Sequence, residues 1–173
     1  MNMASLRDED KPWKTNLARQ SALRRQRVQE ELETAIKKAG SFEEALHNSA
    51  ELMKKRFARF SAVTAYVADG EDLVVHTSLD RPEGPDRVWS GGGPLAEAAK
   101  ADKATLVSDV GDKSDWADVG LSSGSAMVAP VRTAAGLWAI LEVWSDFRDA
   151  FSTPDAKLVE RVTQALAKKT PAA

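Results

Sequence analysis

The chain has 173 residues, of which 43% are hydrophobic and 29% charged, a composition typical of a single soluble globular domain. Its formal net charge of −2 provides no global attraction to nucleic acid or to an anionic membrane. The sequence contains no cysteine, which excludes disulfides, thiolate metal sites and thiol nucleophiles, and its two histidines are too few for a histidine metal cluster.

A polar tail is expected over residues 1–11, followed by a long helix over residues 12–40. Pro12 suits a first helical position and Gly40 suits the cap after the last turn. The apolar stripe of this helix is thin, and its first half is basic whereas its second half is acidic. We therefore expect it to act as a dimerisation arm, paired antiparallel with the same helix of a second copy. Because the basic half lacks aromatic residues in between and any recognition motif, we expect no nucleic acid and no membrane as partner.

A second helix and a β-hairpin are predicted next. Ser41 is a suitable N-cap with Glu44 three residues later, and the apolar residues from 42 to 57 follow the helical period. The period then changes to that of strands over residues 60–68 and 72–79, joined by a tight turn at Asp69 and Gly70.

The remaining elements complete an α+β pattern. They are a loop over residues 81–93, a short helix over 95–103, a strand over 105–110, a polar loop over 111–124, strands over 125–132 and 137–145, a helix over 154–169 and a tail over 170–173. This order predicts an α+β fold, a central antiparallel sheet of four or five strands with the helices from the two ends of the chain packed on one face. The expected domain covers residues 41–169.

Several segments resemble those of GAF domains in their order and spacing. After the turn at Asp69 and Gly70 they are GGGPLAEAA (91–99), ATLVSDV (104–110), GLSSGSAMVAPV (120–131), GLWAILEVWS (136–145) and AFSTPDAKL (150–158). PAS domains share this general plan. The resemblance implies a small sensory module with a pocket on the sheet face away from the terminal helices, closed by the loops at 81–93 and 111–124.

Free methionine-sulfoxide reductases form one branch of this family, and their chemistry uses cysteines that the chain lacks. In that branch an acidic residue of the last strand faces the ligand, and Glu142 stands at the matching place. Alternation along the strand puts Trp138, Glu142 and Trp144 on one face, where a carboxylate between two indoles suits an ammonium or another cation. The alternative interpretation is that Glu142 forms a structural ion pair with an arginine such as Arg132 on the adjacent strand, or reaches solvent at an edge of the sheet.

The other candidate ligand-binding residues are Trp89 and Trp116, in loops, with Met127 and Asp109. The two tryptophans either line the pocket or fill it, and Asp109 equally suits the cap of a turn. His76 is the one candidate for a haem ligand, but an isolated strand histidine is usually a surface residue, so we expect no cofactor and no metal.

The sequence therefore favours a non-catalytic, cytoplasmic GAF-like regulatory module. It is expected to form a homodimer, to bind a small ligand or a protein partner, and to signal through a separate chain. Two alternatives remain open: an enzyme derived from the methionine-sulfoxide reductase branch that works without thiols, and a structural interaction module whose pocket is filled by tryptophan.

Overall fold

Six strands form one antiparallel sheet in the computed structural model, which describes residues 12–112 and 114–171. The strands are β1 (Ala62–Asp69), β2 (Asp72–Leu79), β3 (Arg87–Trp89), β4 (Thr105–Val107), β5 (Ser125–Thr133) and β6 (Gly136–Ser145). Their order across the sheet is β3-β2-β1-β6-β5-β4, so β1 and β6 occupy the centre. The predicted fold class is confirmed. The sequence prediction missed one strand, β3, whose residues we expected to lie in a loop.

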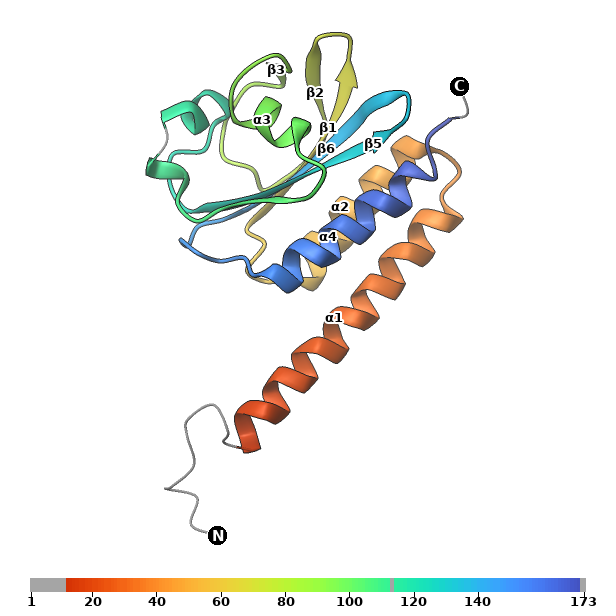
Figure 1. Cartoon of the computed structure of the whole chain (residues 1–173), viewed down its shortest axis with the longest axis vertical. Helices are drawn as coiled ribbons and strands as arrows, with labels where there is room; N and C mark the ends of the chain where they lie inside the picture. Colours follow the sequence, from red (N-terminus) through yellow and green to blue (C-terminus); the bar gives the residue numbers. More distant parts are fainter. Residues whose placement is uncertain (1–11, 113, 172–173) are drawn as a thin grey trace.

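The helices lie on both faces of this sheet (Figure 1). They are α1 (Pro12–Lys38), α2 (Phe42–Arg56), α3 (Pro94–Lys100) and α4 (Thr153–Ala167), with short 3-10 helices η3 (Val110–Asp112) and η4 (Ser114–Val119). As predicted, α2 and α4 cover one face, while α3 and the long loops lie on the other. None of the described helices is both long and apolar enough to cross a lipid bilayer.

Side-chain caps define where α2 and α4 begin. Ser41 Oγ accepts a hydrogen bond from Glu44 N at 3.1 Å, and Gly40 N donates to Glu44 Oε2 at 2.8 Å. Asp155 plays the part of Glu44 in α4, because its Oδ2 accepts from Ser152 N at 2.8 Å. At both helix starts, therefore, side chains accept hydrogen bonds from backbone N–H groups that would otherwise lack partners.

The sheet separates two apolar cores. The helix-side core joins α1, α2 and α4 to one face of the central strands, including Val63 and Leu141. The loop-side core joins α3 and the loops to the other face, including Tyr66 and Ile140. Neighbouring residues of one strand thus enter different cores, as the alternation of strand side chains requires.

The second half of α1 belongs to the helix-side core. Val28, Leu32, Ile36 and Ala39 are all buried there, and Arg56 of α2 forms a two-pronged ion pair with Glu31 at 2.9 and 2.7 Å. The thin stripe was expected to serve a partner chain, but this half of it packs on its own domain. Figure 1 shows the first half of α1 extending beyond the other helices.

Asp155 is expected to be important for stability, because its side chain is only 2% exposed and ties three segments together. Besides capping α4, its Oδ1 accepts from Arg59 and lies 3.7 Å from Arg25 Nε of α1. Replacement by asparagine keeps the size but removes the charge, so we predict that Asp155→Asn lowers the free energy of unfolding by about 2 kcal/mol. Urea denaturation measures this. The matched control is Asp146→Asn at an exposed position, with an expected change within about 0.5 kcal/mol. Equal losses in both variants would contradict the assignment.

Candidate functional site

A β-bulge in β6 changes which predicted site residues share a face. Arg132 is paired with Leu137 and Val131 with Ala139, so Trp138 is the extra residue between them. The indole of Trp138 therefore lies on the helix side, where it packs edge-on against Phe42 with ring centroids 6.0 Å apart. The prediction that Trp138 shares a face with Glu142 is wrong, because a bulge interrupts simple alternation.

Met127 is also separated from Glu142 by the sheet. It is fully buried in the helix-side core, opposite Val143. A ligand beside Glu142 would therefore not contact Met127. Asp109 has the role of a turn cap, since its Oδ1 accepts from Gly111 N at 2.9 Å and its Oδ2 lies 3.2 Å from Arg148 Nε.

The other three tryptophans proposed as ligand-binding residues differ in burial. Trp144 is half-buried on the face of Glu142, and its Nε1 donates to Ser123 O at 2.8 Å. Trp116 is 3% exposed and packs in the loop-side core. Trp89 is 60% exposed at the end of β3, so it does not cover that face. Of the four tryptophans singled out from the sequence, Trp116 and Trp144 lie on the same side of the sheet as Glu142.

Glu142 lies at the centre of the sheet with its side chain in the loop-side half of the protein. Its neighbours across the strands are Thr64 of β1 and Val128 of β5, and it is 1% exposed. Arg81, from the loop after β2, reaches the same place with a side chain that is 4% exposed. Arg81 Nε lies 3.6 Å from Glu142 Oε1, and its guanidinium carbon lies 5.5 Å from the ring centroid of Tyr66.

The polar groups of this cluster are incompletely paired. Four of its buried atoms have no partner with good hydrogen-bond geometry among the described residues: Thr64 Oγ1, Tyr66 OH, Arg81 Nε and Glu142 Oε2. Tyr66 and Arg81 are nevertheless close enough to Glu142 to act as weak hydrogen-bond donors that lower the pKa of its carboxyl group. Arg81 instead donates from Nη2 to Val119 O and from Nη1 to Pro85 O, the latter at 3.3 Å. Buried polar atoms are almost always hydrogen-bonded, so four unpaired atoms in one cluster are unusual and mark a place where another polar group would be stabilised.

Burial raises the pKa of Glu142 from 4.5 to about 7, against the opposing effect of the Arg81 charge. Burial also raises the pKa of Tyr66, and the nearby Glu142 charge adds to that rise. The carboxyl group is thus half ionised near neutral pH, and the phenol stays protonated. Among them these side chains offer a carboxylate acceptor, a hydroxyl and a cation.

Sequence reasoning missed three residues of this cluster, Thr64, Tyr66 and Arg81, of which Arg81 carries the charge. The sequence pointed to Arg132 as a structural partner of Glu142, but Arg132 Nε donates to Ala99 O at 2.7 Å. Glu142 thus does lie beside an arginine, as the ion-pair alternative expected, but the arginine is Arg81 and not Arg132. The one signal in the sequence is the loop itself, because Pro82 and Pro85 restrict it to few conformations and so let it hold a side chain in a fixed place.

Histidine does not contribute to this site. His76 is exposed and its Nε2 lies 3.2 Å from Glu43 O. Across residues 12–112 and 114–171, no group of three or more His, Cys, Asp or Glu side chains is arranged to hold a metal ion.

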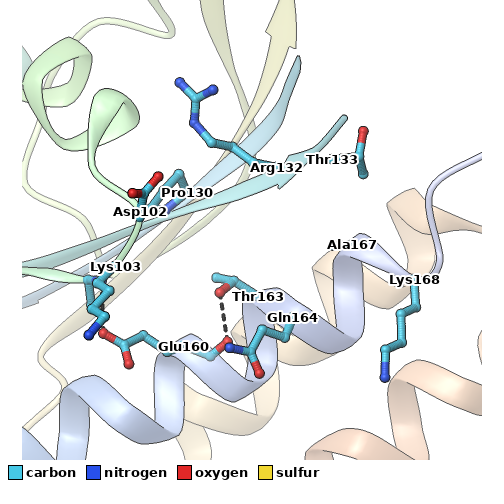
Figure 2. A pocket seen from close by; sticks show the side chains of 11 residues that line it. Asp102, Lys103, Pro130, Arg132, Thr133, Glu160, Thr163, Gln164, Ala167 and Lys168 are labelled. Carbon is cyan, nitrogen blue, oxygen red and sulfur yellow. Dashed lines mark hydrogen bonds between the residues drawn. The ribbon is translucent and has the colours of Figure 1, made fainter. Parts of the chain in front are cut away.

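Large hollows lie elsewhere. One of about 730 Å³ lies between α1 and α4. A groove of about 650 Å³ runs between α4 and β5, on the helix side (Figure 2). Its lining includes Lys103, Glu160 and Gln164, and none of its lining residues was predicted from the sequence to bind a ligand. Arg132 also belongs to the lining, but its side chain points away from α4. A smaller hollow of about 290 Å³, between α3, β4 and η4, has Trp116 in its wall. It is on the loop side, as Glu142 is.

Comparison of the whole fold with solved structures gives consistent matches. The free methionine-R-sulfoxide reductase from Neisseria meningitidis, solved in complex with its substrate, superposes with a TM-score of 0.74 at 24% identity, covering 84% of this chain and 87% of that one. A GAF sensor protein from Burkholderia vietnamiensis superposes with a TM-score of 0.77 at 21% identity, covering 86% and 94%. The chain has the GAF fold.

The GAF fold is shared with a second free methionine-R-sulfoxide reductase, that of Staphylococcus aureus in complex with substrate. It matches with a TM-score of 0.75 at 16% identity and covers 85% of this chain and 95% of that chain. No protein-family model and no curated protein sequence matches the chain. At these identities the likeness establishes the GAF fold alone. Thiol-dependent reduction of a sulfoxide has no nucleophile in this chain, which contains no cysteine.

Proposed function

We propose that this GAF-fold chain is a non-catalytic regulatory module that binds a small cationic molecule through Glu142. The observation that carries the proposal is the Glu142 carboxylate, buried at the centre of the sheet with one oxygen unpaired. A buried acceptor without a hydrogen bond destabilises the folded protein, so a ligand that donates a hydrogen bond to it would bind with a gain in free energy. Two reductases with the same fold are solved in complex with substrate.

The proposed role is binding because the cluster offers complementary charge and hydrogen-bonding groups but no thiol. Glu142, Arg81 and Tyr66 provide charge and hydrogen bonds, and thiol chemistry is excluded by composition. A regulatory output would then arise from ligand-dependent changes in the loops around residues 81–93 and 111–124, passed to a partner chain.

A thermal-shift screen of the full chain against nucleotides, amino acids and other small amines tests this proposal. We expect one class carrying an ammonium or guanidinium group to raise the melting temperature. At ten times its Kd the rise should be about 3–5 °C, and it should be absent in Glu142→Gln. Glu97→Gln, at an exposed position of α3, is the matched control and should keep the response. No shift across the panel, or an equal shift in Glu142→Gln, would contradict the proposal.

A second candidate function is supported by Trp116. Its indole is almost fully buried among apolar residues on the side of the expected pocket, as in a module whose pocket is closed by its own side chain. Such a module would recognise a protein partner through its surface. If the chain is folded and stable but no compound of the screen changes its melting temperature, this candidate function is favoured.

The first half of α1 is our proposed dimer contact. Leu17 is 60% and Leu23 44% exposed there, and a helical extension of this length without packing is marginal in water. We predict a dimeric mass by light scattering at micromolar concentration and a monomeric mass after deletion of residues 1–24. This deletion spares Val28 and the rest of the core. Leu17→Glu should also weaken the dimer, whereas Thr34→Glu, exposed on the packed half, should not. A monomeric mass for the intact chain would rule out this contact.

A further inference from the structure

Arg81 is an unusual residue for its loop. The residues that follow it from 83 to 86 are exposed, whereas the Arg81 side chain itself is 4% exposed and lies beside Glu142. Burying a guanidinium is costly unless its donors and its partner are well paired. The quality of that pairing therefore decides whether the contact is a firm structural bond or one that a competitor could replace.

The chain contains a good pair for comparison. Arg56 and Glu31 form two hydrogen bonds of 2.9 and 2.7 Å although both side chains are about 40% exposed. The buried pair of Arg81 and Glu142 approaches only to 3.6 Å, and both Arg81 Nε and Glu142 Oε2 lack partners. The contact of Arg81 with Glu142 thus leaves the carboxylate unsatisfied in the place where an unsatisfied charge costs most.

Arg81 also holds together the two segments that cover this face. It donates to Val119 O at the end of η4 and to Pro85 O in its own loop. The two backbones touch, because a Cβ atom at Gly120 would lie only 2.6 Å from Glu83 O. Removal of Arg81 from this place would therefore loosen the contact between the loop and the end of η4.

We propose that Arg81 is an internal competitor for the ligand of Glu142: a small molecule with a guanidinium or ammonium group displaces Arg81, and the displacement releases the η4 segment from the loop at residues 80–86. This inference rests on the proposed binding function and adds its regulation. Ligand binding to Glu142 therefore also separates the two covering segments, and a partner chain would recognise this change in structure.

Chemical rescue tests the competition directly. In Arg81→Ala, methylguanidinium should occupy the space left by the side chain and restore a cation beside the Glu142 carboxylate. We expect it to raise the melting temperature of this variant by about 3–5 °C at ten times its Kd, relative to sodium chloride. The wild-type chain, in which Arg81 competes for the same carboxylate, should show a smaller rise at the same concentration, and Arg81→Ala/Glu142→Gln should show none. Arg87→Ala is the matched control, because it loses the exposed contacts to Asp69 and Asp72 without opening a buried space. Absence of rescue in Arg81→Ala would overturn the proposal.

Hydrogen exchange in Arg81→Met provides a second measurement that does not depend on rescue, since methionine fills much of the space without the charge. Amides of residues 80–86 and 114–120 should exchange at least about tenfold faster than in the wild-type chain, with the β1 and β6 amides unchanged. Unchanged exchange in both covering segments would contradict the proposed release.

The two proposals fail in different ways. If a ligand from the screen depends on Glu142 but binds the wild-type chain and Arg81→Met with equal affinity, the competition is wrong and the binding function stands. If methylguanidinium rescues Arg81→Ala and exchange rises in Arg81→Met, but no compound of the panel acts on the wild-type chain or Arg81→Met, the binding function is wrong and Arg81 only holds the two covering segments together.

Discussion

Replacement of Trp116 by alanine is expected to lower the free energy of unfolding by about 3–5 kcal/mol, the usual cost of removing a large buried aromatic side chain. The indole is 3% exposed and packs with Leu95, Val110 and Leu121 in the loop-side core. These contacts fix the 3-10 helix η4 against the sheet. They matter because η4 is short and has few hydrogen bonds of its own to stabilise it. Urea denaturation followed by circular dichroism measures the loss.

Trp89→Ala is the matched control for this prediction. Its side chain is 60% exposed, so the same change in side-chain size should cost about 1 kcal/mol or less. Similar losses for the two variants would show that η4 is not held by Trp116, and would remove the support for a pocket closed by tryptophan.

The second large effect is a dependence of stability on pH that comes from Glu142. Because the folded-state pKa of about 7 lies above the ordinary value of 4.5, the folded protein binds more protons than the unfolded chain between these two values. The contribution of this carboxyl group is therefore fully present below about pH 4.5 and is lost as the pH rises through 7. The difference amounts to about 3 kcal/mol at 1.36 kcal/mol per pKa unit.

Comparison with Glu142→Gln isolates this contribution. Glutamine does not titrate, so the unfolding free energy of the wild-type chain minus that of the variant should fall by about 3 kcal/mol between about pH 4.5 and pH 8. The constant penalty of leaving Arg81 without a carboxylate shifts this difference equally at every pH and does not change its slope. A flat difference, or one that rises with pH, would contradict the raised pKa.

The architecture could be predicted from the sequence because it depends on local patterns. The cap at Ser41, the turn at Asp69 and Gly70 and the apolar stripes of α2 and α4 each determine a short segment. Together they were sufficient for an antiparallel sheet with helices from both ends of the chain on one face. β3 escaped prediction because three residues are too short for an alternation to be seen.

The candidate site was predicted less well because it depends on contacts between distant segments. Glu142 could be singled out, since a charged residue in an apolar central strand is conspicuous. The bulge that moves Trp138 to the other face leaves no clear mark in the sequence, and it results from the pairing of β5 with β6. Arg81 meets Glu142 from 61 positions away through a loop that reads as an ordinary polar turn. The fully buried residue Ile36 shows the same limit in α1, whose stripe looked too thin for a core.

A direct measurement of the Glu142 pKa tests most closely the claim that this buried carboxylate lacks a full set of hydrogen-bond donors. Carbon-13 labelling of the glutamate carboxyl groups makes the titration visible by NMR, and the signal that disappears in Glu142→Gln assigns it. Because burial outweighs the opposing charge of Arg81, we expect a midpoint of about 7 in the free protein, and a displaced signal when a ligand from the screen is added. A midpoint at or below the ordinary value of 4.5, with a signal that no compound moves, would mean that Arg81 satisfies the carboxylate and that the cluster is purely structural.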